Sequence, residues 1–284
     1  MFTKVKKSII YIALIILSIV CLCPFLIMLV NSTRSSQEII SSFSLVPGSS
    51  LQSNWKIMSD YFNIFKGLGN SLFIAVCVTA LSGYFSALTA YGLAVYNFKG
   101  RNALFTTILV LMMVPAQLGL LGFYDLVNGL GLMDSYIPLI IPAIASPFIV
   151  FFLRQYLVSV LPMSIIEAAR MDGASEIATF HKIGLPIMMP GIATMSIGTF
   201  IGSWNNYLMP LVLLISPDKF TLPVMMGSLS ASKDITANMG ATYVSVAVSV
   251  LPVMIAFCFF SKYIISSISA VSYTHLRAHE TRSN

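Results

Sequence analysis

Long apolar runs separated by short polar segments dominate the hydropathy pattern of this 284-residue chain. A helix needs about 20 mainly apolar residues to cross the hydrocarbon core of a bilayer. Windows that meet this requirement lie at residues 9–30, 70–96, 103–124, 137–153, 187–215 and 241–261. The fourth window is short and contains three prolines, and the fifth is interrupted by polar residues. The pattern therefore predicts an all-helical integral membrane protein with six spans.

Composition excludes the main alternatives to a membrane protein. Hydrophobic residues make up 57% of the chain and charged residues only 9%, whereas soluble domains carry about 25% charged residues. So few charges cannot cover the surface of a soluble enzyme or a nucleic-acid binder. The net charge of +6 arises from short Lys and Arg clusters between apolar runs. That distribution is typical of topology determinants, so we expect a lipid membrane as partner and no nucleic acid.

The distribution of basic residues predicts an orientation. One side of the six windows carries nine of them: Lys4, Lys6, Lys7, Lys99, Arg101, Arg154, Arg170, Lys182 and Lys262. The other side carries five: Arg34, Lys56, Lys66, Lys219 and Lys233. Because cytoplasmic loops hold the excess of Lys and Arg, both termini are predicted to be cytoplasmic. Residues 154–186 then face the cytoplasm, and residues 31–69 face outward.

The windows lack the residues that drive many transporters. They contain no Asp, Glu, Lys, Arg or His, although proton and sodium transporters usually place ionisable groups there. A proton relay is therefore not expected, while neutral groups and carbonyls could still bind sodium. The chain also lacks a phosphate loop of the G-x-x-x-x-G-K type. If this protein moves solutes uphill, another subunit is expected to supply the energy.

The predicted cytoplasmic loop before the fifth window has a helical pattern of its own. Ser164 and Glu167 have the S-x-x-E spacing of a capping box, which predicts the start of a short helix. Gly173 suits the left-handed position just past the end of that helix. A second short helix is predicted from about residue 174 to 183, ending at Gly184-Leu185-Pro186.

Ten residues of this loop share the spacing of a known motif: Glu167, Ala168, Ala169, Asp172, Gly173, Ala174, Phe180, Leu185, Pro186 and Pro190. The run resembles the EAA loop of ABC importer permeases. The resemblance implies a coupling helix that docks on an ATP-hydrolysing subunit. It also implies that Glu167 contacts a basic residue there and that Gly173 makes the turn between the two short helices. From the residues alone, Glu167 and Gly173 could instead only cap their own helix, and that role is compatible with docking.

Other segments resemble the carbohydrate branch of the same family, represented by maltose-type permeases. They are Asn70-Ser71-Leu72, Ala90-Tyr91-Gly92-Leu93-Ala94, Phe98-Lys99-Gly100-Arg101, Gly129-Leu130-Gly131-Leu132-Met133-Asp134-Ser135, Phe151-Phe152-Leu153-Arg154-Gln155 and Phe220-Thr221-Leu222-Pro223. The similarity covers most of residues 9–268. The arginines that this branch usually carries near Val95 and Asn97 are missing, but Lys99 and Arg101 keep that end positive.

A polar break interrupts the fifth window at Trp204-Asn205-Asn206, within a run that resembles the W-N-x-[FY]-L-x-P-L pattern of maltose-type permeases. Polar groups in a span need partners, because an unsatisfied one costs several kcal/mol in lipid. One interpretation is a water-filled pathway in which the indole stacks on a sugar and the amides bind its hydroxyls. The alternative is a structural role in polar contacts between helices or at the membrane interface. Gly198 and Gly202 form a GxxxG pair, which is typical of close helix packing.

The composition changes near the end of the chain. We expect residues 1–268 to form one permease domain with a core at about 70–265, and residues 269–284 to be a non-native or disordered tail. In that tail, His275 and His279 have the spacing of a helical metal pair. No supporting ligand cluster accompanies them, so no metal site is expected.

The resemblance implies a permease subunit of a bacterial ABC importer, located in the cytoplasmic membrane and carrying a sugar. It implies no enzymatic activity and no bound cofactor, since ATP and Mg belong to partner subunits. The expected partners are a second permease subunit in a heterodimer, two ATP-binding cassette subunits, and an extracellular or periplasmic solute-binding protein. Two alternatives stay open: a permease for another small polar solute, and, more distantly, an integral-membrane enzyme. For the enzyme, the sequence offers only the acidic group of Glu167, Asp172 and Glu176.

Overall fold

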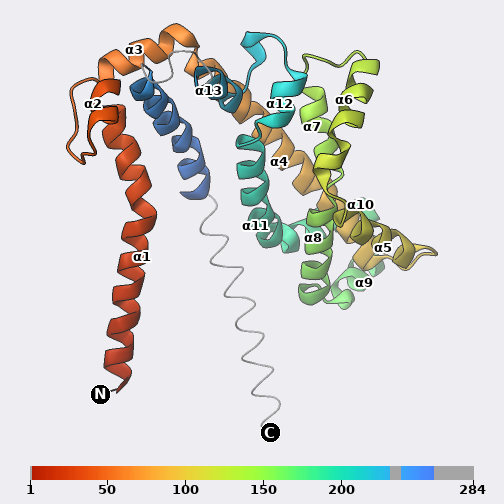
Figure 1. Ribbon diagram of the computed structural model, residues 1–284. Helices are drawn as coiled ribbons and strands as arrows, with labels where there is room; N and C mark the ends of the chain where they lie inside the picture. The colour runs from red at the N-terminus through yellow and green to blue at the C-terminus, as the bar shows by residue number, and fades with distance from the viewer. Residues whose placement is uncertain (1, 231–237, 259–284) are drawn as a thin grey trace. The chain divides into compact units, whose positions relative to one another are not determined.

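A computed structural model of the chain describes residues 2–230 and 238–258 (Figure 1). All regular elements in these ranges are helices, which confirms the predicted all-helical class. The helices divide into two compact units, which we describe separately. The tail predicted at 269–284, with His275 and His279, lies outside the described residues, as do Lys233 and Lys262.

The described residues contain enough long apolar helices for the predicted spans. By length and composition, five could cross a membrane: Lys6–Ser32, Ile64–Val95, Ile137–Val160, Glu176–Trp204 and Met239–Cys258. A sixth span would be the pair Arg101–Met112 and Gln117–Gly129, whose axes are bent by 84°. Pro115 lies in this bend, where its missing N–H and its ring prevent a continuous helix.

The first unit comprises residues 1–68 and 221–252. Its elements are α1 (Phe2–Ser32), α2 (Ser36–Ser41), α3 (Leu51–Tyr61), the start of α4 (Ile64–Val95), α13 (Leu222–Ser230) and most of the helix Met239–Cys258. The buried amide of Asn54 donates hydrogen bonds to the carbonyls of Ser32 at 2.9 Å and Arg34 at 2.8 Å. These bonds satisfy carbonyls that the end of α1 leaves without helical partners, so α3 is fixed to α1 by a side-chain cap.

The second unit comprises residues 69–220 and 253–284. It begins with the remainder of α4, and its further elements are α5 (Arg101–Met112), η1 (Ala116–Gly119), α6 (Leu120–Gly129), α7 (Ile137–Ile140), η2 (Ile141–Ile144), α8 (Pro147–Val160), α9 (Met163–Met171), α10 (Glu176–Thr179), the π-helical turn η3 (Phe180–Gly184), α11 (Leu185–Trp204), α12 (Leu208–Leu213) and η4 (Pro217–Lys219). This unit contains every residue that the sequence singled out as a candidate functional residue.

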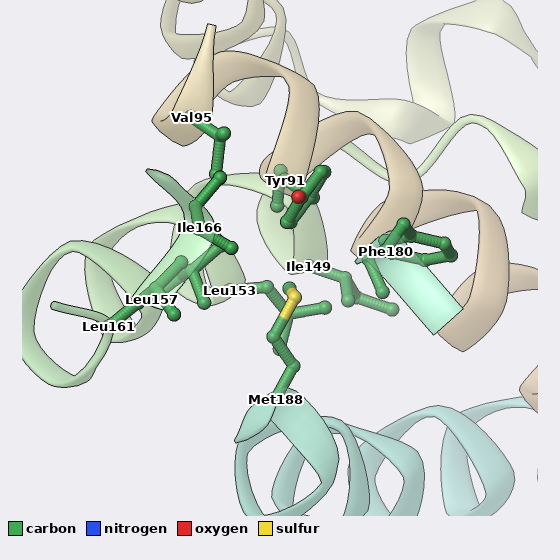
Figure 2. Close-up of a cluster of buried hydrophobic side chains, with 11 residues drawn as sticks. Tyr91, Val95, Ile149, Leu153, Leu157, Leu161, Ile166, Phe180 and Met188 are labelled. Carbon is green, nitrogen blue, oxygen red and sulfur yellow. The ribbon is translucent and has the colours of Figure 1, made fainter. Parts of the chain in front are cut away.

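An apolar core joins α4, α8, α9 and α11 of the second unit (Figure 2). Its buried members are Ala87, Ala90, Tyr91, Val95, Ile149, Leu153, Leu157, Leu161, Ile166, Phe180 and Met188. Glycine permits the close approach of the helices: an added Cβ on Gly184 would lie 2.7 Å from the ring of Tyr91. Small residues at such crossings let membrane helices gain van der Waals contacts that lipid cannot replace.

Two predicted windows had wrong boundaries. The fourth continues past residue 153 to Val160 and is interrupted at Ala145 and Ser146, whose ψ angles of 80° and 93° are not helical. The fifth was expected at 187–215 but begins at Glu176 and ends at Trp204. The polar run after Trp204 therefore ends this span, because Asn205 takes the C-cap position.

The close packing at Gly184 can be tested by adding one methyl group. We expect Gly184→Ala to lower the midpoint of thermal unfolding of the purified chain in detergent, because overpacking costs about 1–3 kcal/mol. Gly198→Ala on the same helix is the control, since a Cβ there meets nothing within 4 Å in the described structure. Equal midpoints for the two variants would contradict the packing of α11 against Tyr91.

Candidate functional site

The EAA-like pattern begins in the segment between the candidate spans Ile137–Val160 and Glu176–Trp204 and continues into the second of them. Its first helix, α9, begins at Met163 with Pro162 in the N-cap position, and no side chain caps it. The predicted capping box of Ser164 and Glu167 is therefore wrong. Ser164 is the second helical residue, so its hydroxyl is not where an N-cap oxygen would lie.

The turn after α9 confirms the backbone conformation predicted for Gly173. Its φ is +77°, the left-handed region that suits glycine. The N–H of Gly173 bonds to the carbonyl of Arg170, and the N–H of Ala174 bonds to the carbonyl of Ala169, both at 3.0 Å. This pair of bonds is a Schellman motif, which satisfies carbonyls at the helix end. The turn sets the direction in which the chain leaves α9 at its C-cap residue, Asp172.

One buried residue attaches α9 to the spans. Ile166 is fully buried in the apolar core beside Leu157 and Leu161 (Figure 2). Other apolar side chains near the turn point outward, with Met171 88% exposed and Ile177 73% exposed. The loop therefore has one apolar residue of α9 on the core and two apolar side chains that are uncovered in the described structure.

Charged residues of the loop fall into two groups. Glu176 accepts two hydrogen bonds from Arg170, at 2.9 and 3.3 Å, and one from the hydroxyl of Tyr96 at 2.6 Å. The guanidinium of Arg170 also lies 5.6 Å from the centre of the Tyr96 ring. By contrast, Glu167 and Asp172 are exposed, and within the described part of the chain their carboxylates make no hydrogen bond or ion pair. Of these three carboxylates, only that of Glu176 is therefore held by an internal contact.

The Tyr96–Arg170–Glu176 brace joins the end of α4 to both arms of the loop. Burial, assisted by the hydrogen bond to Glu176, raises the pKa of Tyr96 to about 12. The phenol therefore remains protonated, and able to donate, throughout the neutral range. The sequence analysis missed this brace, because Tyr96 is 80 residues from Glu176 along the chain and no local spacing signals the contact.

The second helix of the loop does not end where it was predicted to end. α10 passes through the π-helical turn η3 into α11, so Gly184-Leu185-Pro186 lies inside the helical segment Glu176–Trp204 rather than at a stop. Pro186 cannot donate the usual bond and its ring would collide with the carbonyl four residues earlier. The wider turn avoids this, with the N–H of Leu185 bonded to the carbonyl of Phe180. Phe180 is buried, with its ring 5.2 Å from that of Tyr91.

The polar residues after α11 occupy different environments. Trp204 is buried and stacks on Phe200, with ring centroids 6.0 Å apart. Asn205 is exposed and Asn206 partly exposed, and neither amide side chain has a hydrogen bond within the described ranges. Gly198 and Gly202 are also exposed, and a Cβ on either would meet no described atom within 4 Å. The close packing predicted for this glycine pair is therefore not made within the described part of this chain.

A cavity of about 560 Å³ opens where the fourth span is interrupted. Its lining includes Ser82 of α4, Ser146 at the interruption, and Gly198 and Thr199 of α11. Non-helical backbone at membrane depth is tolerated where protein buries it or where it lines a water-filled space. Three prolines in the fourth window were the signal for this interruption, but the sequence did not show which side chains surround it.

The described residues include no group of three or more His, Cys, Asp or Glu placed to hold a metal ion. The described lining of the cavity contains no charged side chain. The arrangement therefore combines a neutral cavity between spans with an exposed helical loop at one end of the same spans.

Comparison with known proteins adds an independent finding. A family model described as "binding-protein-dependent transport system inner membrane component" matches residues 81–270. The chain is 39% identical over 265 residues to the arabinooligosaccharides transport system permease protein AraQ of Bacillus subtilis, covering 89% of this chain and 90% of that protein. It is 32% identical over 258 residues to the diacetylchitobiose uptake system permease protein NgcG of Streptomyces coelicolor, covering 90% and 85%.

A solved structure shows the same fold. The chain matches a bacterial ABC transporter involved in the import of the acidic polysaccharide alginate with a TM-score of 0.79 and 22% identity. The match covers 92% of this chain and 97% of that chain.

The brace predicts a local change when one hydroxyl is removed. Tyr96→Phe keeps the ring but loses the 2.6 Å hydrogen bond to Glu176. We expect faster amide hydrogen exchange in the loop segment 174–179, measured by mass spectrometry on the purified chain. Tyr11→Phe, in the exposed part of α1, is the matched control and should leave that segment unchanged. Unchanged exchange in Tyr96→Phe would show that the brace does not hold the loop.

Proposed function

Because the chain belongs to the family of binding-protein-dependent transport system inner membrane components, we propose that it is the permease subunit through which a sugar, in the form of an oligosaccharide, enters a bacterial cell. The family description places the chain in the inner membrane and makes it one component of a transport system that depends on a binding protein. ATP hydrolysis belongs to a partner subunit. This chain supplies the membrane passage.

Similarity along almost the whole chain carries the proposal of a sugar. AraQ and NgcG are named for arabinooligosaccharide transport and diacetylchitobiose uptake, and each match covers about nine tenths of this chain. The cavity at the break in the fourth span supports the same substrate class. Its lining includes the hydroxyls of Ser82, Ser146 and Thr199. Those of Ser82 and Thr199 donate to the carbonyls of Thr79 and Met195, so they can accept hydrogen bonds from sugar hydroxyls.

Uptake measurements test the substrate class directly. A strain that lacks this chain should lose ATP-dependent uptake of labelled oligosaccharide and recover it when the chain is restored. Normal oligosaccharide uptake together with loss of another polar solute would favour the remaining transport alternative. Loss of neither would contradict a transport role.

The proposed coupling site is the loop that contains Glu167, Ala168, Ala169, Asp172, Gly173, Ala174, Phe180, Leu185 and Pro186. Two features of its geometry support docking on the ATPase. Glu167 is exposed on α9 and has no described internal partner, so its carboxylate is available to a basic residue of another subunit. Ile166 and Phe180 are buried in the apolar core, so a force on the loop would reach α4, α8 and α11 through packed side chains.

The proposed assembly is a heterodimer with a second permease, together with two ATP-binding cassette subunits. Gly198 and Gly202 support a helix partner, since they leave an exposed strip on α11 where another backbone could approach closely. Asn205 and Asn206 follow at the end of the same helix. We propose that these two amides and Trp204 contribute to the substrate pathway. The burial of Trp204 against Phe200 favours a supporting role for the indole.

The domain bounds of 1–268, with a core at 70–265, are also part of the proposal. So is the orientation with both termini in the cytoplasm, which rests on the basic residues counted along the sequence.

Cysteine accessibility tests the orientation. In a background without native cysteines, Ser50→Cys should react with a membrane-impermeant maleimide added to intact cells. Ser175→Cys should react only after the membrane is opened, although its side chain is exposed. Labelling of position 175 in intact cells would contradict the orientation and, with it, the coupling role of the loop.

Gly173 allows a matched test of the coupling loop. Gly173→Leu should reduce sugar uptake sharply, because a bulky side chain resists a positive φ and would also collide with a docked partner. Gly173→Asn should retain much of the uptake, since Asn adopts this conformation more readily. The measurements are uptake, membrane level of the chain and copurification of the ATPase. Wild-type uptake by Gly173→Leu with the ATPase attached would contradict the assignment of the loop.

Glu167→Ala should have a smaller effect than Gly173→Leu. An exposed ion pair contributes roughly 0–1 kcal/mol, and more where docking removes water from it. We expect partial loss of uptake with a normal membrane level. An uptake loss as complete as that of Gly173→Leu would show that the carboxylate does more than form one intersubunit ion pair.

A further inference from the structure

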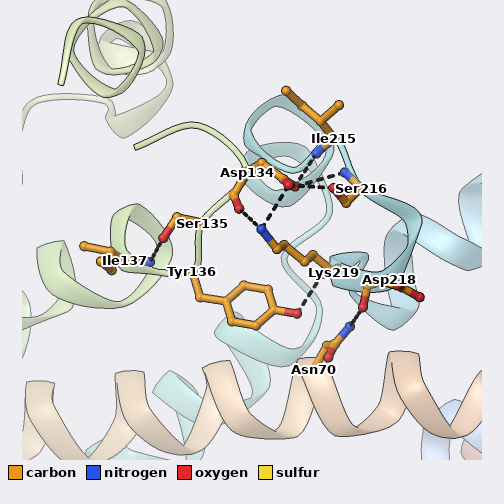
Figure 3. Close-up of polar contacts among 9 residues, drawn as sticks. All are labelled: Asn70, Asp134, Ser135, Tyr136, Ile137, Ile215, Ser216, Asp218 and Lys219. Atoms are coloured by element: carbon orange, nitrogen blue, oxygen red, sulfur yellow. Dashed lines mark hydrogen bonds and ion pairs between the residues drawn. The ribbon is translucent and has the colours of Figure 1, made fainter. Parts of the chain in front are cut away.

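Three segments that lie outside the proposed coupling loop meet at one place in the second unit (Figure 3). They are the part of α4 around Asn70, the loop between α6 and α7 at Asp134, and the segment after α12 that ends at Phe220. Asn70 and Phe220 are 150 residues apart in sequence, and Asp134 and Lys219 are 85 apart. Side chains, rather than a continuous helix, hold these segments together.

Asp134 is the centre of this cluster. Its carboxylate accepts hydrogen bonds from the backbone N–H groups of Ile215 and Ser216, both at 2.9 Å, and from the Ser216 hydroxyl at 2.6 Å. Lys219 Nζ bonds to the same carboxylate at 3.0 Å and to the Asp134 carbonyl at 2.6 Å. The Asp134 N–H donates to the carbonyl of Leu213 at 2.8 Å. Every polar group of this residue is therefore used to bind the segment 213–219.

The backbone of Asp134 shows how strongly the cluster fixes it. Asp134 is the only residue other than glycine in the described ranges with a positive φ, +57°. That conformation is uncommon for a residue with a Cβ, and it persists where the surroundings determine it. Hydrogen bonds to the carboxylate also keep the pKa of Asp134 well below its usual range, so the charge is present at neutral pH.

Asn70 adds the second span to the cluster. Its amide donates to the carbonyls of Asp218 and Phe220, both at 2.9 Å, and the Tyr136 hydroxyl donates to the carbonyl of Lys219 at 3.2 Å. The chain passes from one compact unit to the other between residues 68 and 69 and between residues 220 and 221. Within the second unit, Asn70 therefore joins its segment of α4 to residues 218–220.

We propose that Asp134, Lys219 and Asn70 are positioning residues, which together form a clasp. The clasp makes three parts of the chain move as one body during transport: the segment of α4 around Asn70, the α6–α7 loop and the α12–η4 segment. The transport half of this inference rests on the proposed permease function. The clasp contains none of the coupling-loop residues. It therefore keeps in register span ends that lie outside the proposed coupling loop.

The physical half is tested by amide hydrogen exchange on the assembled transporter. Asp134→Gly preserves access to the positive φ but removes every carboxylate contact, and Asp134→Asn preserves size while removing the charge. Exchange at Ile215 and Ser216 should rise about tenfold or more in both variants, since charge-assisted hydrogen bonds are the strong ones. Asp125→Asn, at an exposed position of α6, is the matched control and should match wild type. Wild-type protection at Ile215 and Ser216 in Asp134→Gly would overturn the clasp.

The functional half is tested by the amount of sugar imported per ATP hydrolysed in proteoliposomes. Both Asp134 variants should lower this ratio several-fold while ATP hydrolysis continues. Lys219→Met should lower it less, because the N–H contacts of Asp134 remain. If the Asp134 variants import the normal amount of sugar per ATP although amide exchange at Ile215 and Ser216 is faster, the clasp only stabilises the fold. That result would overturn the positioning role. If the unaltered complex imports no sugar, the proposed function is contradicted. The clasp would then be judged by the amide exchange at Ile215 and Ser216 alone.

Discussion

Burial of Ile166 and Phe180 among α4, α8 and α11 is the interaction on which the functional arrangement of the second unit depends. These two side chains come from the loop, and the rest of the cluster comes mainly from the spans. Because packed cores change arrangement in discrete steps rather than deforming smoothly, the loop cannot move far without moving the helices. Gly184 permits this contact, since any larger residue would meet the ring of Tyr91.

Backbone irregularities place the polar groups of this unit. The prolines of the fourth window interrupt a span beside Ser82 and Thr199, and Pro186 is accommodated by a π-helical turn where the loop joins α11. In lipid, such breaks survive only where other groups or water satisfy the freed backbone. The prolines that interrupt regular helix therefore lie both at the uncharged cavity and at the joint next to the proposed coupling loop.

Features that depend on residues close together in the sequence could be predicted more reliably than contacts between residues far apart in it. The windows predicted the helical class, and Gly173 predicted a left-handed turn, because both depend on residues that are neighbours in the chain. The capping box failed because Pro162 starts α9 before Ser164. The predicted fifth span began and ended too far along the chain, because the polar residues after Trp204 were interpreted as an interruption of the span rather than as its end. The Tyr96–Glu176 and Asp134–Lys219 contacts could not be predicted, since they depend on how separate helices pack.

Replacing Ile166 tests the central claim that the buried face of the loop connects the ATPase to the spans. Ile166→Ala should leave a cavity and cost about 2–5 kcal/mol, whereas Ile166→Val should cost about 0.5–1.5 kcal/mol. The measurement is sugar imported per ATP hydrolysed by the reconstituted transporter. We expect the ratio to fall strongly for Ile166→Ala and slightly for Ile166→Val, with the ATPase still bound in both. An unchanged ratio for Ile166→Ala would contradict the claim.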